Sequence, residues 1–380
     1  MFNKNMIYQC SNVDISGGGG IETYVASLLN YRLPDMSDRL ITSLKDVDLS
    51  QFKLLHIHNQ ALLVELRGEC SLKCPSIYTL HNHSSYCPSG TKYLKVRGVC
   101  CDRNMSTLAC TWGHLVDSCG SRRPQNIIRN LQDSHRELET LKKLRIPVIA
   151  NSDYVRGQLI KNGLSPEQSV TVRYGISIPK ITTEPLSFET HKNQRILFAG
   201  RIVPDKGLDW LLKAFTQTDQ RIQLDIAGDG WERPRMEKLA ARLGVSDRVT
   251  WYGWCSPEKL DKLYQQCFAL VFPSVWPEPA GLVTIEAYAH YRPVIASAVG
   301  GIPEHVRDGE TGFLVPSNDV KKLAIAITNL SKDYQKSRLM GEQGYAWFIE
   351  EFTITTHLKR LKEIYENTIT NFHAQDKTFK

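Results

Sequence analysis

Residues 195–228 read RILFAGRIVPDKGLDWLLKAFTQTDQRIQLDIAG, and this stretch decides the fold. Two β-rich runs, 195–200 and 222–228, flank a segment over 206–215 whose apolar residues have helical spacing. A strand, a helix and a second strand in this order predict a βαβ unit with parallel strands. The pattern continues, with strands predicted at 249–253, 268–273 and 293–297 and helices at 232–243, 257–267 and 282–290.

The first half of the chain repeats this alternation. The runs MIYQC, LLHIH, SIYTL and PVIA are typical of strands, and helical stretches lie between them. We therefore predict an α/β protein of two doubly wound Rossmann-like domains. The aperiodic stretch 173–189 carries two prolines and indicates the linker. We expect an N-terminal domain at 1–180, a C-terminal domain at 181–345 and a helical segment at 346–380 that packs back on the N-terminal domain. Helix-spaced apolar residues mark that last region from about 337 to 370.

Composition limits the class of protein. The chain has 380 residues, 42% of them hydrophobic and 23% charged, which suits two or three globular domains. No apolar run approaches the roughly 18–20 residues of a spanning helix, and the start, MFNKNMIYQC, is too short and polar for a signal sequence. We expect a soluble, cytoplasmic protein.

The net charge of +7 lies entirely in the first half. Residues 1–180 hold 22 Lys and Arg against 15 Asp and Glu, whereas residues 181–380 hold 25 of each. Such a basic face attracts anionic lipid, phosphorylated acceptors or nucleic acid, although a merely solvated face is the simpler alternative. We expect peripheral contact of this half with a membrane and no nucleic-acid partner, because few aromatic residues interleave the basic ones.

Eight of the ten cysteines fall within the first 119 residues. Only Cys70 and Cys74 approach the spacing of zinc ligands, so the sequence assigns no metal ligand. The polar, Gly-rich segment of about 87–120 is interpreted as an irregular cysteine-bearing insertion. Free structural thiols are the leading interpretation, and a metal site or disulfides remain alternatives.

Candidate chemistry concentrates in loops that follow strands. In doubly wound sheets, ligands bind beyond the carboxyl ends of the strands, and we expect the site in a deep cleft between the two domains. Four glycines at 17–20 precede a helix, which suits close approach to an anion. Arg201 and Lys206 follow the strand at 195–200 and would neutralise a diphosphate. Glu278 precedes a helix that contains Glu286, and its first turn supplies amide donors to a leaving diphosphate.

Several motifs in order resemble the donor domain of a GT-B retaining glycosyltransferase of family 4. They are Gly200-Arg201 with Lys206-Gly207, Ala227-Gly228-Asp229-Gly230, Pro273-Ser274, Glu278-Pro279-Ala280-Gly281-Leu282 with Glu286-Ala287, Gly300-Gly301-Ile302-Pro303-Glu304 and Gly312-Phe313-Leu314-Val315. The N-terminal half resembles the family through the glycine loop, His58, His81 and Asn151-Ser152.

The resemblance implies a role for each matching residue. Arg201 and Lys206 would hold the donor diphosphate, Glu278 the hydroxyls of the donor sugar, and Glu286 the ribose. His81 would lie beside the reacting sugar carbon. The other donor-binding positions that it implies are Gly18, Gly19, Gly200, Gly228, Gly281, Leu282 and Val283.

The leading hypothesis is a retaining enzyme that moves a sugar from a nucleotide-sugar donor to a lipid-linked or polysaccharide acceptor at the inner face of the membrane. No cofactor is expected, and UDP, GDP and ADP donors remain open. One alternative keeps the fold for a nucleotide-sugar epimerase or a soluble transferase of small metabolites. Another is a catalytically silent binding scaffold, which the presence of Arg201, Lys206, Glu278 and Glu286 disfavours.

Overall fold

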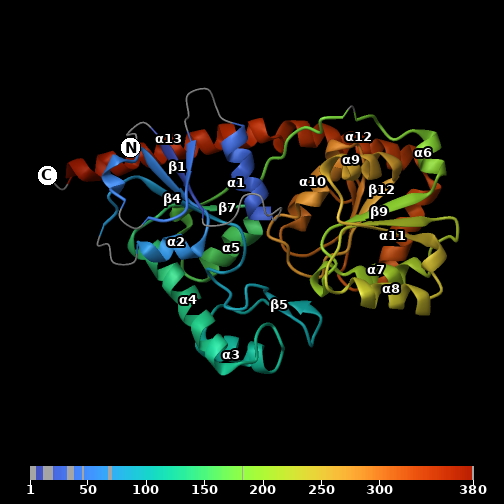
Figure 1. Ribbon diagram of the computed structural model, residues 1–380, viewed down its shortest axis with the longest axis horizontal. Helices are drawn as coiled ribbons and strands as arrows, with labels where there is room; N and C mark the ends of the chain where they lie inside the picture. The colour runs from blue at the N-terminus through green and yellow to red at the C-terminus, as the bar shows by residue number, and fades with distance from the viewer. Residues whose placement is uncertain are drawn as a thin grey trace. The chain divides into compact units, whose positions relative to one another are not determined.

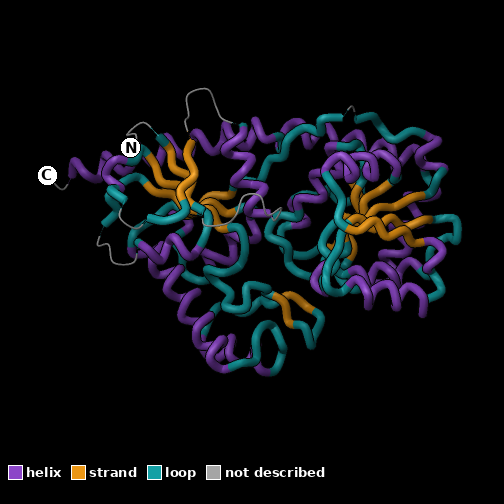
Figure 2. Tube along the Cα trace, viewed as in Figure 1, coloured by secondary structure: helices purple, strands orange, loops and turns teal. Residues whose placement is uncertain are grey.

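The computed structural model describes residues 6–11, 20–31, 38–44, 47–66, 71–181 and 183–378. Its chain divides into two compact units. The first comprises Met1–Arg97, Cys101–Gly175 and Ile354–Lys380, and the second Gly98–Cys100 and Ile176–Thr353. Each contains one six-stranded sheet of parallel strands, drawn in Figures 1 and 2, which confirms the two predicted Rossmann-like sheets.

The sheet of the first unit has the strand order β2-β1-β3-β4-β7-β8. In chain order its strands are β1 (Ile7–Cys10), β2 (Asp38–Ile41), β3 (Leu54–Ile57), β4 (Ser76–Leu80), β7 (Val148–Ala150) and β8 (Ser169–Thr171). The helices of this unit are α1 (Gly20–Asn30), α2 (Gln60–Glu65), α3 (Thr107–Leu115), α4 (Pro124–Lys143), α5 (Asp153–Lys161) and α13 (Ile354–Thr378), with 3-10 turns η1 (Leu49–Gln51) and η2 (Pro166–Gln168). Strands β3, β4 and β7 are buried at every position, because helices cover parallel sheets on both faces.

The insertion between β4 and α4 is more regular than the sequence indicated. It contains the short strands β5 (Tyr93–Leu94) and β6 (Val99–Cys100) and the nine-residue helix α3. Ser106 begins α3, because its side chain accepts a hydrogen bond from the amide of Ala109.

The sheet of the second unit has the order β11-β10-β9-β12-β13-β14. Its strands are β9 (Arg195–Ala199), β10 (Gln223–Ala227), β11 (Val249–Gly253), β12 (Ala269–Phe272), β13 (Val294–Ser297) and β14 (Gly312–Val315). Its helices are α6 (Phe188–Lys192), α7 (Leu208–Phe215), α8 (Arg233–Arg242), α9 (Pro257–Gln266), α10 (Leu282–Ala289), α11 (Val320–Lys332) and α12 (Tyr334–Glu351), with 3-10 turns η3 (Pro204–Lys206), η4 (Ser246–Arg248) and η5 (Ile302–Glu304). All five strands and four helices predicted here between 195 and 297 form, with ends that differ by one or two residues.

The predicted helical stretch from about 337 to 370 is confirmed as helical, but it is not a single element. It is two helices, α12 and α13, which are interrupted at Phe352 and Thr353. The carbonyl of Phe352 accepts a hydrogen bond from the amide of Ile176, and Ile176 forms a parallel bridge with Thr353. These two residues therefore pair as extended backbone, which the apolar spacing could not reveal.

None of the helices within the described ranges combines the length and the apolar composition needed to cross a bilayer.

Candidate functional site

The candidate site of the second unit lies where the order of its strands reverses. From β9 the chain adds β10 on one side and later returns to add β12 on the other. Loops that follow two such neighbouring strands diverge and leave a crevice, which is where open α/β sheets bind ligands. The loop after β9 carries Arg201 and Lys206, and the loop after β12 carries Glu278. Topology therefore brings these three residues to the same edge.

Lys206 and Glu278 form an ion pair, although 72 residues separate them. The Nζ atom of Lys206 donates to Oε1 of Glu278 at 2.5 Å. The hydroxyl of Ser274 lies 2.8 Å from the same carboxylate oxygen. Glu278 is only 5% exposed, so its charge depends on these partners. The pair holds a cation and a hydroxyl-accepting carboxylate together at the end of the sheet.

Aromatic rings and a glycine fix the position of Lys206. Its ammonium lies 5.6 Å from the ring centre of Phe272 and 5.4 Å from that of Trp276, at cation–π distances. The next residue, Gly207, has φ +68°, and a Cβ atom there would lie 2.0 Å from the carbonyl oxygen of Pro273. Only glycine permits the turn after Lys206 to approach the β12 loop this closely.

The loop after β13 fixes the backbone of Glu278. The amide of Gly301 donates to the carbonyl of Glu278 at 2.7 Å. Gly300 has φ +59°, and a Cβ atom there would lie 2.5 Å from that same carbonyl oxygen. Three strand ends, those of β9, β12 and β13, thus determine where the carboxylate of Glu278 lies.

The N-terminus of α10 offers hydrogen-bond donors beside this ion pair. Gly281, with φ +66°, precedes the helix and provides no side-chain cap. Within the described part of the chain, no backbone acceptor outside the helix pairs with the amides of Gly281, Leu282 or Val283. The first-turn amides of a helix and its dipole favour an anion at this position.

Glu286 lies one helical turn further along α10. The hydroxyl of Tyr264, in α9, donates to its Oε2 at 3.1 Å. Burial raises the pKa of Glu286 and the nearby charge of Asp261 adds to this, whereas the Tyr264 hydrogen bond opposes it. The side chain is half-buried and oriented by Tyr264, which suits a carboxylate that accepts hydrogen bonds from hydroxyls.

Arg201 differs from Lys206 because its side chain is exposed. None of the ion pairs formed among the described residues includes its guanidinium. Gly200 and Gly228 hold the two loops around it, since a Cβ atom at Gly228 would lie 1.9 Å from the carbonyl oxygen of Gly200. Arg201 is therefore a free cation at the edge of the sheet that also carries Lys206.

The structure places His81 in the first unit, directly after β4. Its Nε2 lies 3.2 Å from Nδ1 of His58, and its Nδ1 is hydrogen-bonded to the hydroxyl of Tyr174. His58 Nε2 lies 2.7 Å from the side-chain carbonyl of Gln9, which can only accept. His58 therefore carries its proton on Nε2, His81 donates from Nε2 to His58, and Tyr174 donates to His81.

Helix α13 completes this buried network. The hydroxyl of Tyr365 lies 2.6 Å from Nδ1 of His56. His357 donates from Nδ1 to the carbonyl of Arg173 at 2.9 Å, so its Nε2 accepts from the hydroxyl of Tyr24, at 3.0 Å.

Burial keeps the histidines of this network neutral. It lowers the pKa of His357 to about 4 and, with a smaller contribution from His357, lowers that of His81 to about 3. Both ring nitrogens of His81 are partnered, and its pKa is far below neutrality. His81 is thus suited to orient a ligand rather than to transfer a proton.

The glycine loop and the cysteines were the other candidate groups in the sequence. The predicted donor residues Gly18 and Gly19 lie outside the described residues. The cysteines that the structure describes are free thiols, and burial raises the pKa of Cys119 to about 12. Across the described ranges, no three His, Cys, Asp or Glu side chains are arranged to hold a metal ion.

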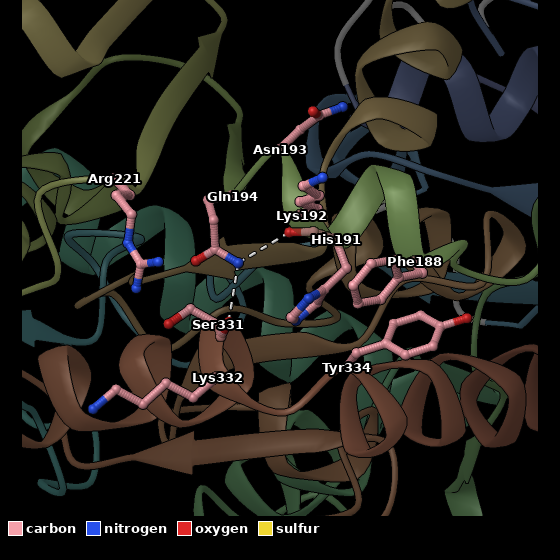
Figure 3. A pocket seen from close by; sticks show the side chains of 9 residues that line it. All are labelled: Phe188, His191, Lys192, Asn193, Gln194, Arg221, Ser331, Lys332 and Tyr334. Carbon is pink, nitrogen blue, oxygen red and sulfur yellow. Dashed lines mark hydrogen bonds between the residues drawn. The ribbon is translucent and has the colours of Figure 1, made fainter.

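A hollow at the opposite edge of the second sheet does not belong to this site (Figure 3). Gln194 and Arg221 line it just before β9 and β10 begin, so it lies at the amino ends of the strands. The side chain of Gln194 donates to the carbonyls of His191 and Ser331, each at 3.0 Å, which ties α6 to α11. Its lining residues are Phe188, His191, Lys192, Asn193, Gln194, Arg221, Ser331, Lys332 and Tyr334.

Sequence reasoning assigned no role to the residues that orient the candidate groups. Ser274 and Tyr264 bind the two carboxylates, and Tyr174 binds His81. Ser274 lies in the Pro273-Ser274 motif, and this motif was the sequence signal that could have identified it. No sequence signal marks Tyr264 or Tyr174, because each binds a residue that is distant in the sequence and becomes a neighbour only in the folded protein.

Comparison with known proteins agrees with this geometry. Residues 183–347 match the family model described as Glycosyl transferases group 1. A D-inositol 3-phosphate glycosyltransferase of Streptomyces bingchenggensis is 35% identical over 227 residues, which cover 54% of this chain and 49% of that protein. The alpha-D-kanosaminyltransferase of Streptomyces kanamyceticus is 31% identical over 173 residues, 45% of each chain. The chain spans about half the length of the curated relatives that it matches.

Solved structures match over nearly the whole chain. Anabaena HepE in complex with UDP has a TM-score of 0.72 at 19% identity, covering 96% of this chain and all of that one. The sucrose-phosphate synthase of Thermosynechococcus elongatus has a TM-score of 0.73 at 21% identity, covering 97% and 100%. Residues 183–347, which make up most of the second unit, are therefore similar to the glycosyl transferases group 1, and the chain as a whole shares the GT-B-like fold of these solved structures.

Proposed function

We propose that this protein transfers a sugar from a nucleotide-sugar donor to an acceptor hydroxyl, with retention of the anomeric configuration. The observation that carries the proposal is the Lys206–Glu278 ion pair beside the open first turn of α10. Cations and amides at this edge suit a diphosphate, and the adjacent carboxylate suits the hydroxyls of a sugar. A nucleoside diphosphate sugar joins these two chemistries in one molecule.

In the proposed mechanism, Arg201, Lys206 and the amides of Gly281, Leu282 and Val283 hold the donor diphosphate. Negative charge builds on the leaving phosphate as the glycosidic bond breaks, and these groups stabilise it without having to reorganise. Glu278 accepts hydrogen bonds from the sugar hydroxyls, and Glu286 from the ribose. His81, whose two ring nitrogens are bound by His58 and Tyr174, contributes the edge of its ring to the sugar. The leaving phosphate oxygen accepts the proton of the acceptor hydroxyl, so no separate base is needed.

We propose a uridine donor, because HepE was solved with UDP and with UDP-glucose. For the acceptor we propose a lipid-linked or glycan hydroxyl, which suits the basic first half of the chain. A small polyol phosphate acceptor is a second candidate, favoured by the relative named for D-inositol 3-phosphate.

Calorimetric titration with UDP, GDP and ADP tests the donor site in wild type and Arg201→Ala. We expect one nucleotide to bind and Arg201→Ala to weaken it about 10- to 100-fold, because a charge-assisted hydrogen bond contributes about 1.5–3 kcal/mol. Arg221→Ala is the matched control, since it removes the same charge from the amino edge of the same sheet. Equal weakening by both variants would contradict the proposed donor site.

A further inference from the structure

Exposed apolar side chains gather on one face of α3. Leu108 is 86% exposed and Trp112 is 56% exposed, and Leu115 and Val116 beside them are exposed as well. These four positions follow the i, i+4, i+7, i+8 spacing of a single helical face. Val96, 66% exposed, adjoins them, because its amide donates to the carbonyl of Asp117 at the end of α3. We call these five residues, Val96, Leu108, Trp112, Leu115 and Val116, the α3 patch.

The opposite face of α3 is fixed to the protein. Gly113 and His114 are buried, and the Nδ1 atom of His114 lies 2.9 Å from the carbonyl of Ser121, to which it donates. In Figure 1, α3 lies at the end of α4 that is farthest from the sheet of the first unit. The α3 patch is therefore presented outward by a helix that cannot simply rotate to bury it.

The segment that carries the α3 patch is rich in positive charge. From Lys95 to Arg136 the chain has seven Lys and Arg residues against three Asp and Glu. One of the three, Asp117, is buried and already bound by Arg97 at 2.9 Å and by Arg103 at 2.7 Å. Among the described residues, five exposed cations of this segment have no carboxylate partner, namely Lys95, Arg122, Arg123, Arg129 and Arg136.

We propose that the α3 patch and these five cations form a docking surface for an anionic lipid bilayer. An amphipathic helix with Trp and Leu on one side and basic residues around it inserts its apolar face at the level of the headgroups. Each nearby cation adds attraction to anionic lipid. A second copy of this chain fits less well, because a symmetric interface would bring the same unpaired cations against each other.

Sedimentation with vesicles of phosphatidylcholine, with and without phosphatidylglycerol, tests this inference without any enzymatic assay. We expect wild type to bind the anionic vesicles and to be released by salt, which screens exposed charges. Leu108→Ser with Trp112→Ser should lower the partition about tenfold or more through lost apolar insertion. Arg122→Glu with Arg123→Glu should lower it by a similar factor through lost attraction to the lipid headgroups.

The matched control is Ile325→Ser with Leu339→Ser, which removes two exposed apolar side chains from the second unit. This control should bind vesicles as wild type does. Wild type that fails to bind anionic vesicles, or an α3 double variant that binds as well as the control, overturns the inference. The inference is also overturned if wild type does not bind vesicles but forms a concentration-dependent dimer in ultracentrifugation, and if Leu108→Ser with Trp112→Ser abolishes that dimer. UDP affinity should be unchanged in every variant, so failure here is distinguishable from failure of the proposed donor site.

Discussion

The two units contain sheets of the same kind, but their strand ends carry opposite chemistry. In the first unit, His58 and His81 belong to a buried, neutral hydrogen-bond network. Tyr174 and residues of α13 supply the remaining partners in this network. In the second, the strand ends hold a charged pair, Lys206 and Glu278, beside amides that pair with no backbone acceptor outside their own helix among the residues described. Shared topology therefore locates a site, and the side chains placed there decide whether it is filled by the protein itself or left for a ligand.

The largest effect should come from removing the negative charge of Glu278 at the candidate site of the second unit. Glu278→Gln keeps the shape and a hydrogen-bonding group but loses the carboxylate that we assign to the sugar hydroxyls. We expect turnover of the donor to fall about 10²- to 10³-fold, the usual effect of losing one transition-state contact, with UDP affinity nearly unchanged. Steady-state kinetics and calorimetry measure the two quantities. Glu237→Gln, an exposed carboxylate on α8, is the control, and normal turnover by Glu278→Gln would refute the assignment.

A smaller effect, on stability, is expected from alanine substitutions at two glycines of the second unit. Comparing them distinguishes the cost of close packing from the cost of backbone strain. Gly207 and Gly244 have nearly equal φ values, +68° and +67°, but only at Gly207 would a Cβ atom meet another residue. We expect Gly244→Ala to cost about 1–2 kcal/mol from the left-handed conformation alone. Gly207→Ala should cost roughly 2–4 kcal/mol, since overpacking adds to that strain. Denaturant unfolding measures both, and equal costs would show that the η3 turn does not depend on this close approach.

The buried histidine network of the first unit predicts that the free energy of unfolding decreases in acid. An unfolded histidine titrates near pH 6.5, whereas burial lowers the pKa of His357 to about 4 in the fold. As pH falls below 6.5 the unfolded chain binds the proton first. The stability present above pH 6.5 is therefore lost as pH falls toward 4. This histidine alone should account for about 2–3 kcal/mol of that loss.

Unfolding measured from pH 7.5 to 4 compares wild type with His357→Gln, whose pH dependence should be shallower. His135→Gln, at an exposed position on α4, should retain the wild-type slope. A slope that is the same in all three proteins would contradict the neutral network.

Much of the fold could be predicted because periodicity is local. The strands and helices from 195 to 297 follow from apolar spacing and from turn residues, as at Ser256, whose side chain accepts from the amide of Lys259. The break between α12 and α13 could not be predicted in this way. It depends on a pairing with Ile176, which lies far away in the sequence.

The sequence by itself determined which residues could carry the chemistry, because strand-end loops concentrate glycines, cations and carboxylates in a fixed order. It nominated Arg201, Lys206, Glu278 and Glu286 without any contact between them. Only the tertiary structure decided that Lys206 pairs with Glu278, and that His81 lies within a network reaching from Gln9 to Tyr174. The physical reason is that strand order and helix docking set these contacts over tens to hundreds of residues, whereas sequence patterns report only the nearest turns.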